Sequence, residues 1–554
     1  MSLPGTPYTK PGRDKPCPYG LISCNLMGIN PNEFWLIAPE LIVTLFACFA
    51  LIVDIVAPRK RGRWTAFFCL GGITLATIST GVLYRSFHGA ERFAFYRMLV
   101  VDDYAIFFKF LILISAAIAI VISVRFFDVE QQQQGEYYAL ILFATLGMMF
   151  MGAGADLLSL YISLELMAIS IYVLVGFMRD DRRSNEAAMK YFLLGAFSSG
   201  ILLYGISLFY GATASTNLYD INIALPALVA SAQPMRYLLL LALVLVAAGM
   251  CFKIAAVPFH MWAPDAYEGA PTPVTAFMSV GVKTASFAMF TRIFLDGLGG
   301  MRYLPGTNNA GLPGWALILG LAAATTITWG NIAATTQRNV KRLLAYSSIG
   351  HAGYVLLGLV AGNRTGYTGI LIYLLVYAFM NLGAWSVIIA LRRSGIAADQ
   401  VDDLNGLVYK SPALAVFMLI FLLGLAGIPP TAGFIGKYYI FLGLIEAGTV
   451  EGNPWMFALA VLAVLMTAVA VYYYYSIVKA MFLTEASAAE PIEPTRAQWS
   501  VAVATFAMTI GIGVLPQFFI TRSVNAAKRF PVYPHSRTAS PADQPATPQT
   551  GQLR

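Results

Sequence analysis

The feature that most restricts how this chain can fold is the number and length of its apolar stretches. About 20 helical residues cross the hydrocarbon core of a bilayer, and fourteen runs of about 18 or more residues are present. The runs do not alternate polar and apolar residues, as the strands of a membrane barrel would, and lipid tolerates only helices or closed barrels. The sequence therefore predicts an all-α integral membrane protein of about 14 transmembrane helices, at roughly 34–57, 65–84, 104–124, 137–154, 157–178, 187–211, 237–262, 272–296, 315–336, 343–361, 367–391, 413–446, 455–482 and 499–520.

The composition leaves no room for a soluble domain, because 58% of the residues are hydrophobic and only 12% are charged. The net charge of +8 does not indicate nucleic-acid binding, since the longest basic run, at 59–63, adjoins a helix end. The loops after odd-numbered runs carry most of the loop Lys and Arg, and the positive-inside rule makes those loops cytoplasmic. Both termini are then expected outside, with a disordered C-terminal tail rich in Pro, Ser, Thr and Gln.

The cysteines give no sign of a redox centre on this chain. Cys48, Cys69 and Cys251 fall in apolar runs, whereas Cys17 and Cys24 lie in the N-terminal tail and could form a disulfide there. No spacing typical of a metal or an iron–sulfur cluster occurs. The first long run begins near residue 34 and is long enough to remain as an anchor, so no cleaved signal peptide is expected. We expect no cofactor on this chain.

Two of the predicted helices are interrupted. The run 413–446 would be roughly 50 Å long as a straight helix, and Pro429 and Pro430 remove backbone donors within it. They leave the carbonyls of Leu425 and Ala426 without helical partners. Pro258 interrupts the run 237–262 in the same way. Unwound backbone inside a membrane persists only where it is buried in protein or lines a wet cavity, so helices 7 and 12 are predicted to be broken at a transport site.

The two breaks also indicate an internal repeat. Helices 4–8 and 9–13 form two sets of five, each with its fourth member broken, and an odd number of crossings inverts the second set. The predicted parts of the chain are an outside tail at 1–33, helices 1–3 at 34–136, the two five-helix repeats at 137–298 and 299–484, helix 14 at 485–522 and a disordered tail at 523–554.

Four charged residues lie far inside predicted helices: Glu165, Lys253, Lys283 and Lys437. A charge at a helix centre costs about 2.5–3.5 kcal/mol on insertion scales, so each requires a reason. Glu165 has no opposite charge in its own run, and Lys253 is its natural partner from another helix. Two opposite charges in one pocket keep each other ionised, whereas separation drives each towards neutrality. A pair that opens and closes is therefore a proton switch.

Polar side chains at helical spacing extend this set towards Lys437. Ser279 and Ser286 flank Lys283 on its own helix. Two further faces are predicted to complete a relay, formed by Ser347, His351 and Tyr354 on one helix and by Tyr373, Tyr377 and Asn381 on the next. His260 is a further proton-path candidate beside Pro258, although either histidine could be purely structural. The other intramembrane charges are expected to reach out from helix ends or to face partners; they are Glu40, Asp54, Lys109 and Lys479.

The stretch "FKIAAVPFHMWAPDAYEGAPTPVTAFMSVGVK" resembles the signature of the proton-translocating antiporter-like subunits of respiratory complex I and of multisubunit cation/proton antiporters. Within that family, "NEAAMKYFLLGAFSSGILLYG", "KRLLAYSSIGHAGYVLLG" and "GIPPTAGFIGKYYIF" are most similar to the N-type members, and the similarity runs from about 34 to 520. The resemblance implies fourteen helices with helices 7 and 12 broken. It also implies proton translocation by a Glu on helix 5 and lysines on helices 7, 8 and 12, which fall on Glu165, Lys253, Lys283 and Lys437.

The resemblance implies partners as well. Other membrane subunits would adjoin this chain in the bilayer, and FMN, iron–sulfur clusters and quinone would lie in partner subunits that carry out NADH:quinone oxidoreduction. The expected location is a bacterial inner membrane, with the termini on the periplasmic side; a thylakoid membrane is the alternative. Two other functions stay open, a subunit of a sodium/proton antiporter and a structural subunit that does not pump. One local departure from the family is Val282, which stands where a Pro often precedes the helix-8 lysine.

Overall fold

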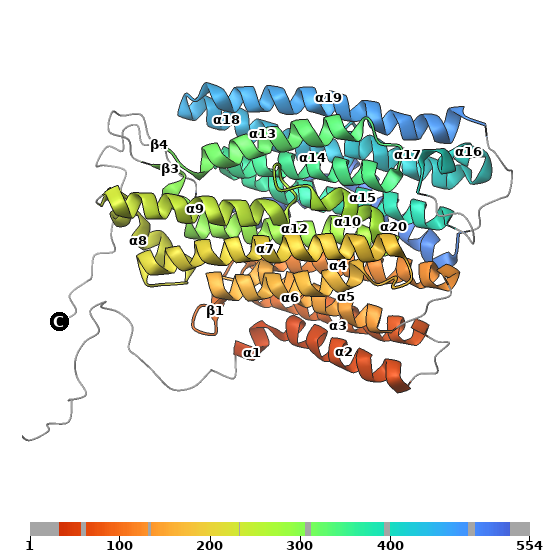
Figure 1. Ribbon diagram of the computed structural model, residues 1–554, viewed down its shortest axis with the longest axis horizontal. Coiled ribbons are helices and arrows are strands. Elements are labelled where there is room, and N and C mark those ends of the chain that lie inside the picture. Colours follow the sequence, from red (N-terminus) through yellow and green to blue (C-terminus); the bar gives the residue numbers. More distant parts are fainter. Residues whose placement is uncertain are drawn as a thin grey trace, which may run out of the picture.

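The computed structural model describes residues 33–56, 62–130, 135–231, 233–304, 312–392, 399–485 and 494–531 (Figure 1). Cys17 and Cys24 lie outside the described residues, as do nearly all of the predicted N-terminal tail and most of the basic run at 59–63. The predicted C-terminal tail is outside them only from residue 532 onwards. Its first residues are helical instead, because the last helix extends to Ala527.

The described chain is almost entirely helical. The helices are α1 (Glu33–Leu36), α2 (Ala38–Val56), α3 (Gly62–Phe87), α4 (Asp103–Glu130), α5 (Glu136–Ala153), α6 (Leu157–Val175), α7 (Arg182–Thr213), α8 (Leu218–Ala230), α9 (Gln233–Lys253), α10 (Trp262–Gly269), α11 (Thr272–Phe277), η1 (Met278–Val282), α12 (Lys283–Thr291), η2 (Arg292–Gly297), η3 (Gly299–Met301), α13 (Trp315–Ala334), α14 (Val340–Ala361), α15 (Arg364–Leu391), η4 (Val401–Leu404), α16 (Leu407–Lys410), α17 (Pro412–Ala426), α18 (Ala432–Glu451), α19 (Pro454–Leu483), α20 (Arg496–Val514) and α21 (Gln517–Ala527). Two short antiparallel hairpins join them, β1 (Arg92–Ala94) with β2 (Leu99–Val101) and β3 (Tyr303–Leu304) with β4 (Leu312–Pro313).

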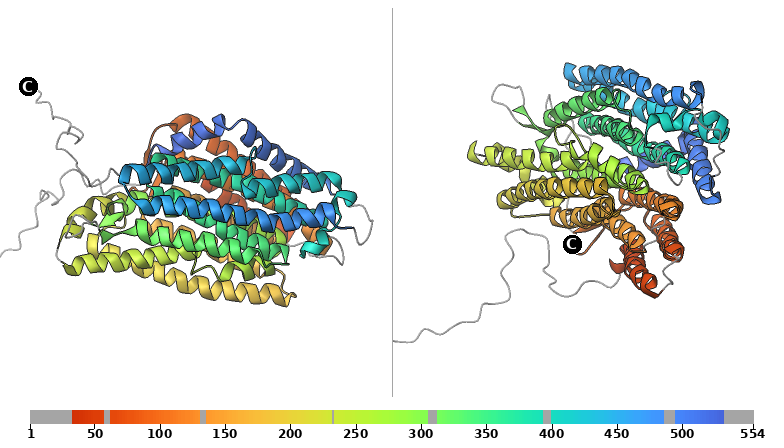
Figure 2. Two further views of the ribbon diagram at one scale, coloured as in Figure 1. Left: turned by 90° about the horizontal axis from the view of Figure 1, so that it is seen from above. Right: turned by 45° about the vertical axis from the view of Figure 1, so that its right-hand side comes forward.

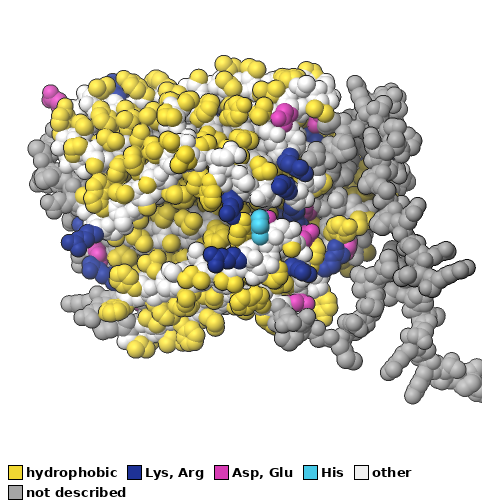
Figure 3. All heavy atoms as spheres, turned by 180° about the vertical axis from the view of Figure 1, so that it is seen from behind, with side chains coloured by type: hydrophobic (Ala, Val, Ile, Leu, Met, Phe, Trp, Pro, Cys, Tyr) yellow, Lys and Arg dark blue, Asp and Glu magenta, His cyan; other side chains and the backbone are white. Residues whose placement is uncertain are grey.

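The predicted membrane architecture is confirmed. Thirteen helices of the described residues are long and apolar enough to cross a membrane, and α17 with α18 makes the fourteenth crossing in two halves. The helices lie side by side in one bundle, with α2 and α3 at one edge and α19 at the other (Figures 1 and 2). The chain then returns, so that α20 packs against α4 and α15. Hydrophobic side chains cover much of the face in Figure 3, and most of its charged side chains lie between the middle of the face and one end of the bundle, with a smaller group at the other end.

Both predicted breaks are present. The helix α9 ends at Lys253 and α10 begins at Trp262, so Pro258 lies in the connecting segment. The helix α17 ends at Ala426, and Gly427 adopts a left-handed φ of +83° before α18 begins. Such a conformation favours glycine because it lacks a Cβ. The breaks fall in the fourth member of each five-helix set, and α9 and α17 run in opposite directions along the bundle, as an inverted repeat requires.

The segment from α11 to η2 is the most enclosed part of the bundle. Its whole apolar window, within residues 272–297, is buried, whereas only 28% of the corresponding windows of α2 and α19 is buried. The backbone of this segment widens into π-helix at η1, directly before Lys283, and again at η2. A π-helical turn shifts the register of the side chains that follow it and is frequent at functional sites. The backbone before Lys283 is therefore irregular although Val282 occupies the position of the family's proline.

Several short elements were not predicted from the apolar runs. They are α8, α16, α21 and the two hairpins, each too short or too polar to be recognised as a membrane span. The β1–β2 hairpin lies at the end of the bundle where the described chain begins and ends. The backbone N–H of Phe95 donates to Glu33, 2.6 Å away, and Arg529 pairs with Glu91 at 2.9 Å.

The expectation that Glu40 and Lys109 reach out from helix ends is wrong. Glu40 on α2 and Lys109 on α4 form an ion pair of 2.8 Å whose side chains are 1% and 0% exposed. Both helices pack against α3 and α5, and neither side chain reaches the surface. Each charge compensates the other in surroundings where an isolated ion would be strongly unfavourable. This pair ties two of the first three membrane helices together.

We predict that Lys109→Met lowers the free energy of unfolding by about 3–5 kcal/mol, because it leaves the Glu40 carboxylate buried without a counter-charge. The effect is measured by thermal unfolding of the purified complex, with the release of this chain as the readout. The double variant Glu40→Leu with Lys109→Met should recover most of the loss, since it removes both charges. Unchanged stability in the single variant would contradict this account of the pair.

Candidate functional site

Lys283 lies at the centre of the bundle, at the first residue of α12. Its side chain is 5% exposed, and its Nζ donates to both the backbone carbonyl and the hydroxyl of Ser348 on α14. The Ser348 hydroxyl also accepts from the Tyr377 hydroxyl, at 2.9 Å. The predicted neighbours Ser279 and Ser286 are not its partners, because the lysine side chain extends away from its own helix to the facing one. Lys283 is therefore held by the second repeat although it belongs to the first.

A chain of polar groups continues from Tyr377 along α15. The Asn381 amide donates to the Tyr377 hydroxyl at 3.2 Å and to the Ser279 hydroxyl at 2.7 Å. All three side chains are buried. The predicted alignment of Tyr377 and Asn381 on one helix face is confirmed by their direct hydrogen bond. Ser279 takes part in the chain through Asn381.

His351 lies one helical turn beyond Ser347 on α14 and has a partner at each ring nitrogen. Nδ1 lies 2.5 Å from the Tyr373 hydroxyl, and Nε2 lies 3.0 Å from the hydroxyl of Tyr474 on α19. The Tyr474 hydroxyl is also hydrogen-bonded to Ser347. An imidazole with two polar partners can accept a proton at one nitrogen and give one up at the other. The geometry thus suits a relay.

Lys437 closes the break between α17 and α18. Its Nζ donates to the carbonyls of Leu425 and Ala426, at 3.2 and 2.9 Å, which are the two groups that the sequence predicted to lose helical partners. The ammonium also lies 4.9 Å from the centre of the Tyr354 ring. The His351 ring lies 6.2 Å from the Tyr354 ring on this side and 5.0 Å from the Tyr377 ring on the other, and Lys283 Nζ lies 6.0 Å from the centre of the Tyr377 ring. His351 therefore stands between the two lysines.

Lys253 and Glu165 are neighbours without direct contact. Lys253, the last residue of α9, donates to the Ser199 hydroxyl at 3.3 Å and is 5% exposed. Glu165 on α6 is half-buried, and α7 packs against both α6 and α9. Among the described residues Glu165 and Lys253 form no ion pair, and Glu165 Oε1 has no hydrogen-bond partner there. The predicted pair is open in this structure.

His260 lies apart from these groups, in the segment between α9 and α10. It is half-buried, and its ring meets Trp329 edge-on at a centroid distance of 6.0 Å. Within the described residues its Nδ1 has no hydrogen-bond partner. The structure does not bring His260 together with the buried lysines, and its place in a proton path stays a prediction.

Several residues of this network were not singled out from the sequence. Ser348 and Tyr474 lie in apolar helices, where a lone hydroxyl gives no signal by itself. Lys341 precedes the predicted span 343–361, so the sequence places it in a loop. In the structure it lies in the first turn of α14, is 4% exposed and donates to the carbonyls of Glu268 and Ala270 at the end of α10, at 3.3 and 3.2 Å. This contact with α10 could not be predicted from the sequence around Lys341.

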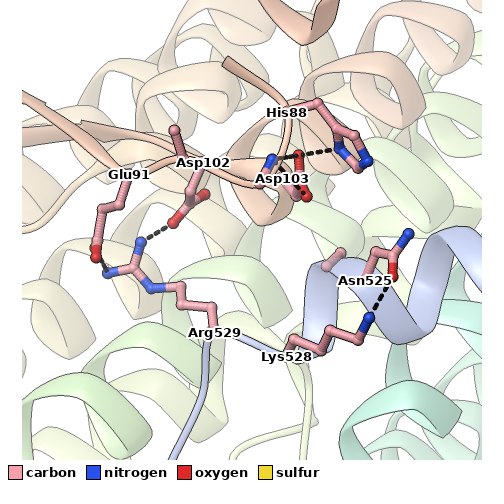
Figure 4. Close-up of a pocket in the computed structure, with 10 residues that line it drawn as sticks. His88, Glu91, Asp102, Asp103, Asn525, Lys528 and Arg529 are labelled. Carbon is pink, nitrogen blue, oxygen red and sulfur yellow. Dashed lines mark hydrogen bonds and ion pairs between the residues drawn. The ribbon is translucent and has the colours of Figure 1, made fainter.

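A second buried charge cluster fastens the outer end of the central segment. Arg292, at the start of η2, donates to Asp102 at 3.0 Å and to the carbonyl of Gly152 at 2.7 Å. Arg529, beyond α21, also pairs with Asp102 and reaches Glu91 (Figure 4). A cavity of about 400 Å³ opens beside these groups. This cluster joins the chain's last helix to α4 and to the helix of Lys283.

The site holds proton-carrying groups and lacks the donor sets of a redox centre. No group of three or more His, Cys, Asp or Glu side chains that could hold a metal ion occurs among the described residues. The buried groups near the breaks are amines, hydroxyls and one imidazole, which exchange protons. Their arrangement is suited to moving a proton between the two repeats.

Known proteins resemble this chain over most of its length. The family described as "NADH:quinone oxidoreductase/Mrp antiporter, TM" matches residues 154–467. "NADH-quinone oxidoreductase subunit N 1" of Koribacter versatilis is 50% identical over 509 residues, which cover 90% of this chain and 96% of that protein. "NADH-quinone oxidoreductase subunit N 2" of Solibacter usitatus is 48% identical over 89% of this chain and 97% of that protein.

Solved structures agree with this relationship. A chain of the respiratory complex I from Thermus thermophilus with bound aureothin superposes with a TM-score of 0.71 and 32% identity, covering 87% of this chain and 98% of that one. A chain of the Mrp complex from Dietzia sp. shares the fold, with a TM-score of 0.74 at 21% identity and coverage of 89% and 97%. The chain belongs to the NADH:quinone oxidoreductase/Mrp antiporter family and, within it, to the group of NADH-quinone oxidoreductase subunit N proteins.

Proposed function

We propose that this chain translocates protons as a membrane subunit of NADH:quinone oxidoreductase, through Glu165, Lys253, Lys283, His351 and Lys437. The observation that carries the proposal is the position of the three lysines, each 5% exposed or less inside an apolar bundle, with hydroxyl and imidazole groups between two of them. A structural lysine normally keeps its ammonium in water by extending from a helix end. Three that do not are best explained by a protonation cycle.

The groups near Lys283 supply the means of transfer. A hydroxyl both accepts and donates a hydrogen bond, so Ser348 and Tyr377 can pass a proton by exchanging their roles. His351 can do the same between Tyr373 and Tyr474. A positive charge on Lys437 repels a positive charge on His351, because the two groups are close and poorly screened. Electrostatic coupling then lets one lysine load while its neighbour discharges.

The open pair of Glu165 and Lys253 supplies the control point. When the carboxylate approaches, it stabilises the protonated Lys253; when it withdraws, the buried ammonium is destabilised and releases its proton. Lys253 lies at the end of α9, beside the helix break, where small backbone shifts change its surroundings. We infer that a change transmitted from a neighbouring subunit acts on this pair first.

The remaining assignments follow from membership in the subunit N group. Electron transfer, with its FMN, iron–sulfur clusters and quinone, takes place in partner subunits. The membrane is the bacterial inner membrane, the termini are on the periplasmic side, and residues 137–298 and 299–484 act as the two repeats. A sodium path is less well supported by the site, because sodium requires a cage of oxygen ligands and the buried groups here include three amines.

We predict that Lys253→Ala and Lys283→Ala each lower NADH:quinone turnover and proton pumping together by about tenfold or more, because each removes a proton carrier for which no neighbour substitutes. Both activities are measured in sealed vesicles, with assembly of the complex checked in the same preparation. Lys479→Ala, at an exposed position of α19, is the matched control and should leave both unchanged. Normal pumping in both variants would refute the proposed relay and leave a structural role as the function of this chain.

A second prediction concerns the link between His351 and Ser347. Tyr474→Phe removes the hydroxyl that contacts both side chains and should slow pumping severalfold without preventing assembly, since the ring still fills its place. Tyr475→Phe removes a hydroxyl from the next residue, which is 52% exposed, and serves as the control. Equal pumping by the two variants would show that the proton does not pass through Tyr474.

A further inference from the structure

The short helix α10 is the second half of a broken membrane helix, and it lies at the end of the bundle opposite the β1–β2 hairpin (Figure 1). It has only eight residues, Trp262–Gly269. Isolated helices of this length are not stable in water, so its position depends on its neighbours. The ring of Trp262 stacks on Tyr191 of α7, with centroids 4.3 Å apart, which fixes the inner end of α10. The other end is held by charges.

Two consecutive cations at the start of α14 hold that outer end. Arg342 contacts the carboxylates of Asp265 and Glu268, each at 2.8 Å. Lys341 donates to the carbonyls of Glu268 and Ala270, where it satisfies the last carbonyls of the helix and complements its dipole. The first repeat is thus joined to the second through this one turn of α14.

The same helix α10 reaches the segment of Lys283 through Tyr267. Tyr267 lies between Asp265 and Glu268 in sequence, so its side chain projects away from Arg342, and it is 3% exposed. Its backbone carbonyl accepts from the Thr275 hydroxyl of α11 at 2.9 Å, and α11 begins the helical segment that carries Lys283. A displacement of α10 therefore moves the start of the segment that holds the proton carrier.

The ion pairs of Arg342 are partly exposed to solvent, unlike the buried ion pairs of the protein. Arg342, Asp265 and Glu268 line an open pocket of about 340 Å³ together with Arg183, Glu186 and Lys190. The side chains of Arg342 and Asp265 are 30% and 34% exposed, whereas those of Arg292 and Asp102 are 0% and 5% exposed. Partly exposed pairs are individually weak and open readily, while a fully buried pair stays closed.

We propose that Arg342 is a positioning residue for proton transfer at Lys283. Its ion pairs with Asp265 and Glu268 hold α10 so that the Tyr267 carbonyl stays bonded to Thr275 of α11, and opening these pairs at the aqueous pocket shifts the segment that carries Lys283 and changes the surroundings of the lysine. The inference rests on the proposed function, in which Lys283 carries protons. It adds a hinged contact between the repeats through which events at the membrane surface reach the buried site.

The test uses the assembled complex in sealed vesicles. Arg342→Gln removes both ion pairs while keeping a polar side chain of similar length, and it should lower NADH:quinone turnover and pumping by about threefold or more, with assembly retained. Arg342→Lys keeps the charge and should recover at least half of the loss. Arg338→Gln, an equal charge change at an exposed position four residues earlier, is the matched control and should be normal.

A double-mutant cycle separates positioning from a general effect of charge. The acids are removed in Asp265→Asn with Glu268→Gln, and adding Arg342→Gln to that variant should lower turnover no further, because the contact is already lost. The same acid variant carries the test if Arg342→Gln fails to assemble. Full activity of the acid variant, an additive loss on combination, or a failure of Arg342→Lys to recover activity would overturn the inference.

Lys283→Ala is measured in the same preparations to separate the two levels of the argument. If Lys283→Ala is inactive and Arg342→Gln is normal, the proposed function stands and the positioning role is refuted. If Lys283→Ala is normal, Lys283 carries no proton in the proposed function, and the positioning role of Arg342 is refuted with it.

Discussion

Every polar group that this bundle buries must find a partner within the protein, because the hydrocarbon surroundings offer none. The contact of Lys437 with the free carbonyls of α17 shows how that constraint is met. The break leaves two carbonyl acceptors without helical partners, and the buried ammonium needs acceptors in place of water. Each group therefore removes the free-energy cost of burying the other. A broken helix and a buried lysine, both unfavourable alone, are stable together. The same interaction keeps a protonatable amine in the middle of the membrane.

The central segment from α11 to η2 owes its position to charges at both ends of the bundle. Arg292 fixes its outer end through Asp102 and Gly152. Near the opposite end, α10 precedes it directly and is fixed by Lys341 and Arg342. Between these anchors the backbone is irregular and Lys283 contacts Ser348. The Arg292 end is firm because its pair is buried, whereas the partly exposed Arg342 pairs can open. The irregular middle then allows small local shifts at the lysine while the rest of the bundle keeps its packing.

The polar network crosses the boundary between the two five-helix sets. Lys283 belongs to the first set and its partner Ser348 to the second, while Arg342 of the second set holds α10 of the first. The ring of His351 lies near those of Tyr377 and Tyr354, and these two rings lie near Lys283 and Lys437 respectively. In the proposed relay, proton transfer between these two lysines therefore requires no long movement.

The sequence by itself determined the helical membrane fold, the two breaks and the three buried lysines, because each depends on local chemistry. Length and apolarity define a crossing, proline removes a backbone donor, and an ion far from a helix end is unfavourable wherever the helix packs. Even the carbonyls of Leu425 and Ala426 were predictable, since the prolines that free them lie four residues later. Only the tertiary structure decided the partners. Lys283 donates to Ser348 and not to Ser279, and Glu40 pairs with Lys109. Lys341 is buried against the end of α10. These contacts join residues far apart in the chain, so they depend on how whole helices face one another.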